Sequence, residues 1–245
     1  MATELEYLKD FNVIKCLSKV SGLEQNEDGR EVLLLEKTCF YPRGGGQDWD
    51  TGFVKADSAT FQVDEVRLVE DGVVWNIGTS IEGKLKIGET VSSEVNSERR
   101  EINTRLHSAG HIVDMAVEQL QLDWIAGRGA HYPHMSFVEY NAPDFETDES
   151  LQQRLQAKID ELSASSYENK IMFVPVEEMG KYCRHIPDNI PTNKPSRIVL
   201  YADDFGIPCG GTHVLKASDI GKIEVTKIKA KKGIVKVSYR LKGIN

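Results

Sequence analysis

Residues 1–95 carry short apolar or alternating runs that are separated by Gly, Asp and Asn residues. The runs are Val32–Glu36, Phe53–Lys55, Thr60–Asp64, Val73–Ile77 and Thr90–Ser92. A period of two places every second side chain on one face of a strand, and the turn residues end each strand. Many short strands at this spacing predict a small β-barrel domain over residues 1–95.

The hydrophobic pattern changes to a helical period after residue 96. From Ser97 to about Leu120 the apolar residues recur every three or four positions, and Asn96 or Ser97 can cap the start of this helix. A second helix is predicted from Glu149 to about Ser165. Strands are expected at 134–140, 170–175 and 196–201, and the chain closes with a hairpin of 223–229 and 234–241. We therefore expect an α+β fold, with a barrel domain followed by an α+β domain at residues 96–245.

The composition is ordinary for a soluble globular protein. The 245 residues are 40% hydrophobic and 28% charged, with a mean hydropathy of −0.37. The acidic N-terminus lacks the pattern of a signal peptide, and no apolar run approaches the roughly 18 residues of a membrane helix. The cysteines at positions 16, 39, 183 and 209 are too irregularly spaced for a disulfide framework. These features predict a cytoplasmic protein with no membrane partner, and they imply no protein partner.

The charge is unevenly distributed along the chain. The formal net charge of −8 argues against a protein wrapped in nucleic acid. Between Lys216 and Lys242, however, there are nine basic and two acidic residues, a local charge of nine minus two, or +7. A basic surface can contact phosphates even on an acidic protein. The alternative is a solvated strand pair whose lysines protect an exposed sheet edge.

Two separated pairs of metal-binding residue types are the most specific chemical signal. They are His107-Ser-Ala-Gly-His111 and Cys209-Gly-Gly-Thr-His213. On a helix, two histidines four residues apart point from the same face and can share one ion. Mixed histidine and cysteine donors in a tetrahedral site are typical of zinc. Neither pair is convincing alone, but together they predict a zinc centre.

The same pairs, with Ser218-Asp-Ile-Gly221 after the second one, resemble the editing domain of alanyl-tRNA synthetase. Cys39-Phe-Tyr-Pro-Arg-Gly-Gly-Gly-Gln47, followed by Asp50-Thr-Gly52, resembles the glycine-rich motif that precedes that domain. The motifs occur in both halves of the chain and in the family's order, with no aminoacylation or anticodon region. The chain therefore resembles the AlaX family of free-standing editing proteins, in their medium form.

The resemblance implies a β-barrel domain followed by an editing domain. It implies hydrolysis of the ester that joins tRNA(Ala) to a wrongly attached amino acid, chiefly serine, with glycine as a second substrate. Its zinc ligands correspond to His107, His111, Cys209 and His213, and its glycine-rich motif to Gly44, Gly45, Gly46 and Gln47. Arg43, Asp48 and Arg128 replace residues that are usual in the family, which bears on substrate preference and not on the reaction class.

The chemical role of the metal remains open at this stage. A zinc ion can polarise the ester carbonyl, lower the pKa of a bound water towards about 7, or hold the substrate's amino group. Four protein ligands are usual for a structural zinc, so catalysis would require that one ligand, His213 in our hypothesis, is displaced, or that the coordination expands. No acidic residue lies at the metalloprotease offset from the histidine pair, so the general base is not predicted.

Substrate contacts are predicted from chemistry alone. The glycines at 44–46 let backbone N–H groups approach a ligand closely, although a tight turn between strands is the alternative. A serine hydroxyl needs a hydrogen-bonding partner, for which Gln47, Thr51 and Thr212 are candidates, and each of them could instead cap local backbone. Four other residues are expected at loop or strand-end surfaces and receive no role: His131, His134, His185 and Cys183.

The predicted partner is mischarged tRNA(Ala), contacted by Lys231, Lys232 and Lys236. The main hypothesis is a zinc-dependent aminoacyl-tRNA deacylase. One alternative is a deacylase for another aminoacyl-tRNA, and the other is a non-catalytic, zinc-stabilised module that binds tRNA. Removal of zinc distinguishes a catalytic from a structural ion, because losing a structural ion unfolds the domain.

Overall fold

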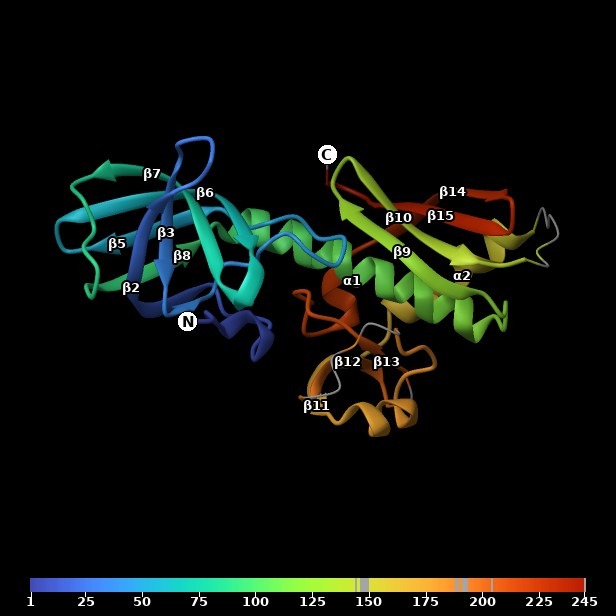
Figure 1. Ribbon diagram of the computed structural model, residues 1–245. Coiled ribbons are helices and arrows are strands. Elements are labelled where there is room, and N and C mark those ends of the chain that lie inside the picture. Colours follow the sequence, from blue (N-terminus) through green and yellow to red (C-terminus); the bar gives the residue numbers. More distant parts are fainter. Residues whose placement is uncertain (144, 146–149, 188–189, 191–193, 204, 245) are drawn as a thin grey trace. The chain divides into compact units, whose positions relative to one another are not determined.

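The computed structural model describes residues 1–143, 145, 150–187, 190, 194–203 and 205–244 (Figure 1). The chain forms two compact units, one from Met1–Gly44 and Asp48–Glu101, and the other from Gly45–Gln47 and Ile102–Asn245. The short segment Gly45–Gln47 is thus grouped with the second unit although it lies early in the sequence. The domain boundary at residue 95 stays a prediction, and each unit is described by itself.

The first unit contains a closed barrel with the strand order β2-β3-β7-β6-β5-β8. Its strands are β2 (Lys15–Gln25), β3 (Glu31–Leu35), β5 (Gly52–Ala56), β6 (Ala59–Leu68), β7 (Val74–Glu82) and β8 (Thr90–Val95). β1 (Glu4–Leu5) pairs in parallel with β4 (Lys37–Thr38). Alternate residues such as Val54, Val63 and Val91 are buried in the barrel core. The predicted small barrel is confirmed.

Strand β2 is the longest of the barrel, and the hydrophobic pattern missed it. It alternates between buried and exposed positions, and its buried side includes Ser18, Val20 and Gly22. Two of these three residues are polar or lack a side chain, so hydrophobicity gives only a weak signal. β2 is a strand because it pairs with β3 and β8, and the hydrophobicity of its own residues does not predict this pairing.

Helix α1 (Ser97–Gln119) starts where the sequence predicts it. The Asn96 side-chain oxygen accepts a hydrogen bond from the Arg99 N–H at 3.0 Å, so Asn96 is the N-terminal cap. Along the helix, Leu106, Ala109 and Val113 are buried, as the helical period requires. Among the described residues, no helix has both the length and the apolar character needed to cross a bilayer.

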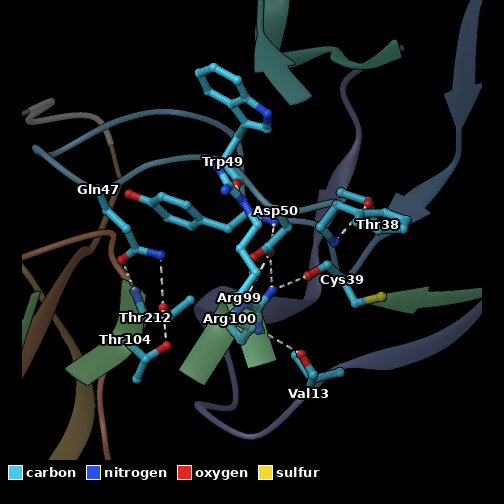
Figure 2. Close-up of polar contacts among 12 residues, drawn as sticks. Val13, Thr38, Cys39, Gln47, Trp49, Asp50, Arg99, Arg100, Thr104 and Thr212 are labelled. Carbon is cyan, nitrogen blue, oxygen red and sulfur yellow. Dashed lines mark hydrogen bonds and ion pairs between the residues drawn. The ribbon is translucent and has the colours of Figure 1, made fainter. Parts of the chain in front are cut away.

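A buried ion pair anchors the first turn of α1 within the first unit (Figure 2). The Arg100 guanidinium donates to the Asp50 carboxylate, with Nε 3.1 Å from Oδ1. It also donates to the carbonyl oxygens of Val13 (3.0 Å) and Cys39 (2.6 Å). The Tyr41 N–H donates to the second Asp50 oxygen at 2.6 Å. We call these five residues the Arg100 cluster. Because protein groups surround both charges, the motif residue Asp50 has a structural task here.

The second unit contains a four-stranded antiparallel sheet in the order β14-β15-β10-β9. The strands are β9 (Ile125–Tyr132), β10 (Met135–Asn141), β14 (Ile223–Lys231) and β15 (Ile234–Leu241). Tyrosines on the inner face of the sheet join it to α1. The Tyr239 hydroxyl donates to the Leu106 carbonyl at 2.9 Å, and the Tyr140 hydroxyl donates to Asp114 at 2.6 Å.

Helix α2 (Leu151–Ser163) packs against the edge strand β14. The Gln152 amide donates to the Val225 carbonyl at 3.0 Å, and the Gln156 amide donates to the Ile223 carbonyl at 2.9 Å. The Gln156 side-chain oxygen accepts from the Val225 N–H at 2.8 Å. These side chains satisfy backbone groups that an edge strand leaves unpaired. The second predicted helix is confirmed, although its first predicted residue, Glu149, lies outside the described residues.

A smaller sheet in the order β11-β12-β13 completes the second unit. Its strands are β11 (Lys170–Val174), β12 (Ser196–Ala202) and β13 (Phe205–Pro208). The predicted strands at 134–140, 170–175 and 196–201 and the final hairpin are confirmed to within two residues. Strands β9 and β13 were not predicted. Both contain glycine, and β13 ends in Pro208, so their local preference for strand is weak.

Candidate metal centre

The two pairs of metal-binding side chains meet in the second unit. His107 and His111 lie one turn apart on α1, whereas Cys209 and His213 lie on the segment after β13. One ligand atom of each residue lies within 4.8 Å of the other three. The Cys209 Sγ is 3.5 Å from the His107 Nε2 and 3.3 Å from the His213 Nε2. A tetrahedral zinc ion, with bonds of about 2.0–2.3 Å, separates its donor atoms by roughly 3.3–3.6 Å, so the two distances from the Cys209 sulfur match such an ion.

Burial keeps the three imidazoles of the cluster neutral. It lowers the pKa of His107 and of His213 well below their ordinary value, and the neighbouring histidines lower both further. The same loss of hydration lowers the pKa of His111 to about 3. A neutral imidazole offers a lone pair, so a metal ion does not have to displace a proton from these rings at neutral pH.

Cys209 is the most exposed member of the cluster. Burial raises the pKa of its thiol, and the Gly211 N–H, which donates to Sγ at 3.3 Å, partly opposes this shift. The thiol therefore needs a cation to become a thiolate at neutral pH. Arg197 holds the surrounding backbone, because its Nη1 donates to the carbonyl oxygens of Cys209 (2.5 Å) and Gly211 (3.0 Å).

Gln47 of the glycine-rich segment determines which His107 nitrogen faces the cluster. Its side-chain oxygen accepts from the His107 Nδ1–H at 2.8 Å and from the Thr212 N–H at 3.1 Å. Its amide nitrogen donates to the Thr212 hydroxyl at 2.9 Å, and that hydroxyl is 2.7 Å from the hydroxyl of Thr104 (Figure 2). With Nδ1 protonated, the lone pair of His107 lies on Nε2, which faces the Cys209 sulfur. Gln47 thus orients a metal-competent ring from behind.

Tyr201 and Ser108 make the corresponding contacts to His213. The Tyr201 hydroxyl is 2.7 Å from the His213 Nδ1, and the Ser108 hydroxyl is 3.3 Å from the same nitrogen. Ser108 also accepts from the Val214 N–H at 3.1 Å. Hydrogen bonds at Nδ1 leave Nε2 to face Cys209. Neither residue was predicted from the sequence, although Ser108 lies directly after a predicted ligand.

Two glycines bring the backbone close to these rings. A Cβ atom on Gly211 would lie 2.1 Å from Cε1 of His107, which is closer than any side chain can approach. Gly46 has a φ of +75° and packs against the backbone of Gly129, whose oxygen would lie 2.6 Å from an added Cβ. Glycine at these positions is therefore needed for close packing against the metal-competent histidine and the neighbouring strand.

The expectation that His131 lies at the surface is wrong. Its ring is buried and stacks on the His107 ring, with 4.7 Å between the centroids. Its Nδ1 lies 2.6 Å from the Tyr239 hydroxyl, and its backbone N–H donates to the Gly46 carbonyl at 2.8 Å. Its burial depends on β9, which was not predicted and whose buried positions do not alternate. Cys183 was also expected at the surface and is buried with Met179 and Ile198.

The remaining candidate residues occupy different environments. Gln47 and Thr212 are fully buried, and each is hydrogen-bonded to the other. Gly45 and Gly46 belong to the second unit with Gln47, while Gly44 and Thr51 belong to the first. His134 and His185 are exposed, as expected.

The three predicted tRNA-contacting lysines lie on the last hairpin. Lys231 and Lys232 are exposed at its turn. Lys236, on β15, is partly buried, lies over the Phe137 ring at 3.2 Å from its centroid, and pairs with Glu139 at 3.4 Å. Lys231 and Lys232 are thus the more accessible of the three.

Comparison with known proteins finds similarity to aminoacyl-tRNA synthetases. The family described as tRNA synthetases class II (A) matches residues 4–99. The chain is 26% identical over 250 residues to an alanine–tRNA ligase of Methanobrevibacter smithii, covering 97% of this chain and 27% of that protein. It is 28% identical over 247 residues to an alanine–tRNA ligase of Saccharolobus islandicus, and the match covers 97% of this chain and 26% of that protein. The chain spans about a quarter of the length of the curated relatives it matches, and its resemblance to alanyl-tRNA synthetase is confirmed.

Proposed function

We propose, from the similarity of nearly the whole chain to a quarter of alanine–tRNA ligases, that this protein is a trans-editing hydrolase. Its substrate would be mischarged tRNA(Ala), chiefly Ser-tRNA(Ala), with Gly-tRNA(Ala) as a second one. The homology supports a role in aminoacyl-tRNA chemistry. The finer assignment to ester hydrolysis rests on the chemistry of the second unit.

The observation that carries the proposal is the convergence of four metal-competent donors. Two of the imidazoles direct Nε2 towards the Cys209 sulfur, and each has its Nδ1 engaged by a neighbouring side chain. Structural tasks such as core packing do not require this pattern, because they do not need neutral lone pairs directed to one point. A metal ion does require it. The donor types and their separations suit zinc.

A zinc ion held by His107, His111, Cys209 and His213 would supply a Lewis acid beside the ester. Gln47 and Tyr201 would keep His107 and His213 oriented during the reaction. The buried environment would strengthen the interaction between charged groups and exclude bulk water. The ester of an aminoacyl-tRNA is already activated relative to an amide, so modest catalysis would suffice.

Substrate contacts by Thr51 and by the glycines 44–46 stay a prediction. Gln47 and Thr212 were expected to contact the substrate, but both side chains are buried and hydrogen-bonded to each other. We propose that these two side chains act on the substrate through the position of His107, and that backbone groups of the glycine-rich segment approach the aminoacyl end.

The outer face of the final hairpin is the proposed tRNA-contacting surface. Lys227, Lys229 and Lys231 alternate along β14 and are exposed. Lys229 pairs across the strands with Lys236, which places them on one face. A row of lysines on a sheet face is suited to phosphate contacts, whose strength falls as salt concentration rises.

The decisive experiment measures serine release from Ser-tRNA(Ala) by the zinc-loaded protein, with Ala-tRNA(Ala) as the specificity control. We expect fast release of serine, slow release of alanine, and loss of the activity in Cys209→Ala. Metal content should be measured on the same samples. Equal release of serine from several unrelated tRNAs would favour a deacylase of another specificity. Release no faster than the spontaneous rate, with folded and zinc-loaded protein, would refute the proposal.

The four-donor set also supports a second candidate, a non-catalytic module that binds tRNA and is stabilised by zinc. Structural zinc sites are usually closed by four protein ligands, as this one would be. A chelator distinguishes the two candidates. For the enzyme, zinc removal should abolish the rate and leave most of the fold intact. For the module, it should lower the unfolding temperature strongly and there should be no rate to lose.

A further inference from the structure

A small pocket in the second unit lies beside the candidate metal centre. Asp114 and Glu118 of α1 line it, together with Trp124, Tyr140, Arg184, His185 and the residues of β13. Its volume is about 80 Å³. On this measure a cavity needs roughly 10–15 Å³ to hold one water molecule, so the pocket accommodates a group the size of a few waters. That is the size of a small aminoacyl group and far less than a nucleoside requires.

Asp114 presents a carboxyl to this pocket. One of its oxygens accepts from the Tyr140 hydroxyl at 2.6 Å. Arg184 also lines the pocket, and its guanidinium donates to Asp123 at 2.9 Å; among the described residues no ion pair joins a cation to Asp114. The surroundings raise the pKa of Asp114 to about 7, chiefly through burial, and Glu118 adds to the shift. A cationic ligand at this carboxyl would offset the cost of burying its negative charge.

The pocket adjoins the metal-competent residues through both segments that carry them. Asp114 follows His111 by three positions on α1, so it lies on the same side of the helix one turn further along. Pro208, which lines the pocket, directly precedes Cys209. The Asp114 carboxyl is close enough to raise the pKa of the Cys209 thiol. None of the four donors lines the pocket, but both segments that carry them pass beside it.

We propose that Asp114 binds the protonated α-amino group of the aminoacyl substrate and that the small pocket holds the attached residue. The inference rests on the proposed function and names the group that recognises the substrate's ammonium. Trp124 and Tyr140, whose ring centroids are 5.5 Å apart, supply an aromatic wall that favours a cation. Tyr140 orients the carboxyl, and Glu118 adds negative charge. In this arrangement the metal centre is left free to act on the ester.

The test compares a free with a blocked amino group on the same ester. Rates and KM are measured for Ser-tRNA(Ala) and N-acetyl-Ser-tRNA(Ala) with the zinc-loaded wild type, Asp114→Asn and Glu161→Gln. Glu161 is an exposed carboxyl on α2 and serves as the charge-matched control. We expect the wild type to prefer the free amine by at least about tenfold in kcat/KM, which is the usual effect of a charge-assisted hydrogen bond.

In Asp114→Asn this preference should disappear, mainly through a higher KM for Ser-tRNA(Ala), while the rate with the acetylated ester stays within about twofold. Glu161→Gln should behave as the wild type. An Asp114→Asn variant that slows both esters equally, or a wild type that does not discriminate between them, would overturn the inference. If Asp114→Asn fails to fold, Tyr140→Phe keeps the charge and removes its orienting hydrogen bond. It should reduce the preference about two- to threefold, and an unchanged preference would count against the inference.

A binding arm separates failure of the inference from failure of the proposed function. L-serinamide and N-acetyl-L-serinamide carry the same side chain and differ in the amino group. Calorimetry should detect tighter binding of serinamide to the wild type and no such difference in Asp114→Asn. If neither ester is hydrolysed but this difference is found, the deacylase proposal fails and the ammonium site stands. If serinamide binding is lost on zinc removal and is insensitive to Asp114→Asn, the metal holds the amino group and the inference is wrong.

Discussion

The Arg100 cluster of the first unit and the histidine–cysteine cluster of the second are both buried and both built from sequence motifs. In the Arg100 cluster, the charges of Arg100 and Asp50 are matched by each other, by carbonyl oxygens and by a backbone N–H. In the other cluster, hydrogen bonds engage the outward nitrogens of His107 and His213, and their inward nitrogens meet at Cys209. The first cluster is complete as a protein structure, whereas the donor atoms of the second are arranged as they would be around a cation.

This comparison separates a residue that stabilises a fold from a residue that serves a ligand. A buried charge that protein groups match fully is expected to act on the free energy of unfolding. Buried lone pairs directed to one point are expected to act on ligand affinity and activity. The variants below test this separation, beginning with the largest expected effect.

Arg100→Met should lower the free energy of unfolding by about 3–5 kcal/mol, because it leaves the buried Asp50 carboxylate without its partner. Urea denaturation of the zinc-loaded protein measures this effect. Arg99→Met is the matched control, since Arg99 is partly exposed and donates to Asp48 and to the Trp49 carbonyl. Its cost should be about 1 kcal/mol. Equal costs for the two variants would contradict the structural role of the Arg100 cluster.

Cys209→Ala should lower serine release from Ser-tRNA(Ala) at least about 100-fold and abolish stoichiometric zinc binding, because it removes a metal donor. Metal analysis and the deacylation assay measure the two effects. Cys183→Ala is the control, because Cys183 is a buried thiol that packs in an apolar cluster away from the four donors. It should lose stability and keep its zinc. Full zinc binding by Cys209→Ala would exclude this cysteine as a ligand.

Gln47→Leu should weaken zinc binding about 10–100-fold and leave the unfolding free energy of the first unit unchanged. The side chain keeps its approximate size but no longer accepts from the His107 Nδ1–H, so the tautomer and ring orientation are less well defined. Competition with a chromophoric chelator measures the affinity. If the affinity for zinc is unchanged while substrate KM rises, Gln47 contacts substrate directly, as the sequence analysis expected.

Asp114→Asn should change how stability depends on pH. The pKa of Asp114 is raised from 3.8 to about 7 in the folded protein, so between these values the unfolded state has lost the proton that the native state retains. The stabilisation that the protonated Asp114 carboxyl gives the folded protein is therefore fully present below about pH 4 and is lost as the pH rises through about 7. Between pH 4 and 8 the free energy of unfolding of Asp114→Asn should therefore rise relative to that of the wild type by on the order of 1–2 kcal/mol. This figure allows for the carboxyl's exposure to the pocket.

Unfolding by urea at a series of pH values, on metal-free wild type and variant, measures this difference. Subtracting the two profiles removes the contribution of the histidines, which both proteins share. A difference that does not change with pH would show that the carboxyl is ionised throughout the range.

Lys231→Ser with Lys232→Ser should have the smallest effect, a reduction of about two in the slope of log affinity for tRNA against log salt concentration. These lysines are exposed and make no buried contact, so stability should not change. Filter binding or anisotropy at several salt concentrations measures the slope. Lys84→Ser, an exposed lysine of the first unit, is the control. An unchanged slope would remove the hairpin turn from the proposed tRNA surface.

Much of the fold follows from local patterns, and the exceptions have a physical reason. The period-two and helical runs predict most of the barrel, both long helices and the final hairpin. Strands β2, β9 and β13 were missed because small or polar residues occupy many of their positions, including Ser18, Gly22, Gly127 and Pro208. Such strands are defined by pairing with neighbours that are distant in sequence. The wrong expectation for His131 has the same origin.

The donor types and their local spacing follow directly from the amino-acid sequence. His107 and His111 lie four positions apart, as do Cys209 and His213, and helical geometry alone aligns the first pair. The tertiary structure alone brings the two pairs together, lets Gln47 orient a ring 60 positions away, and places Asp114 at a small pocket with Tyr140. The relative position of residues close in sequence is fixed by the geometry of the helix or turn that holds them. Hydrogen-bond partners and burial instead depend on which distant segments fold against each other.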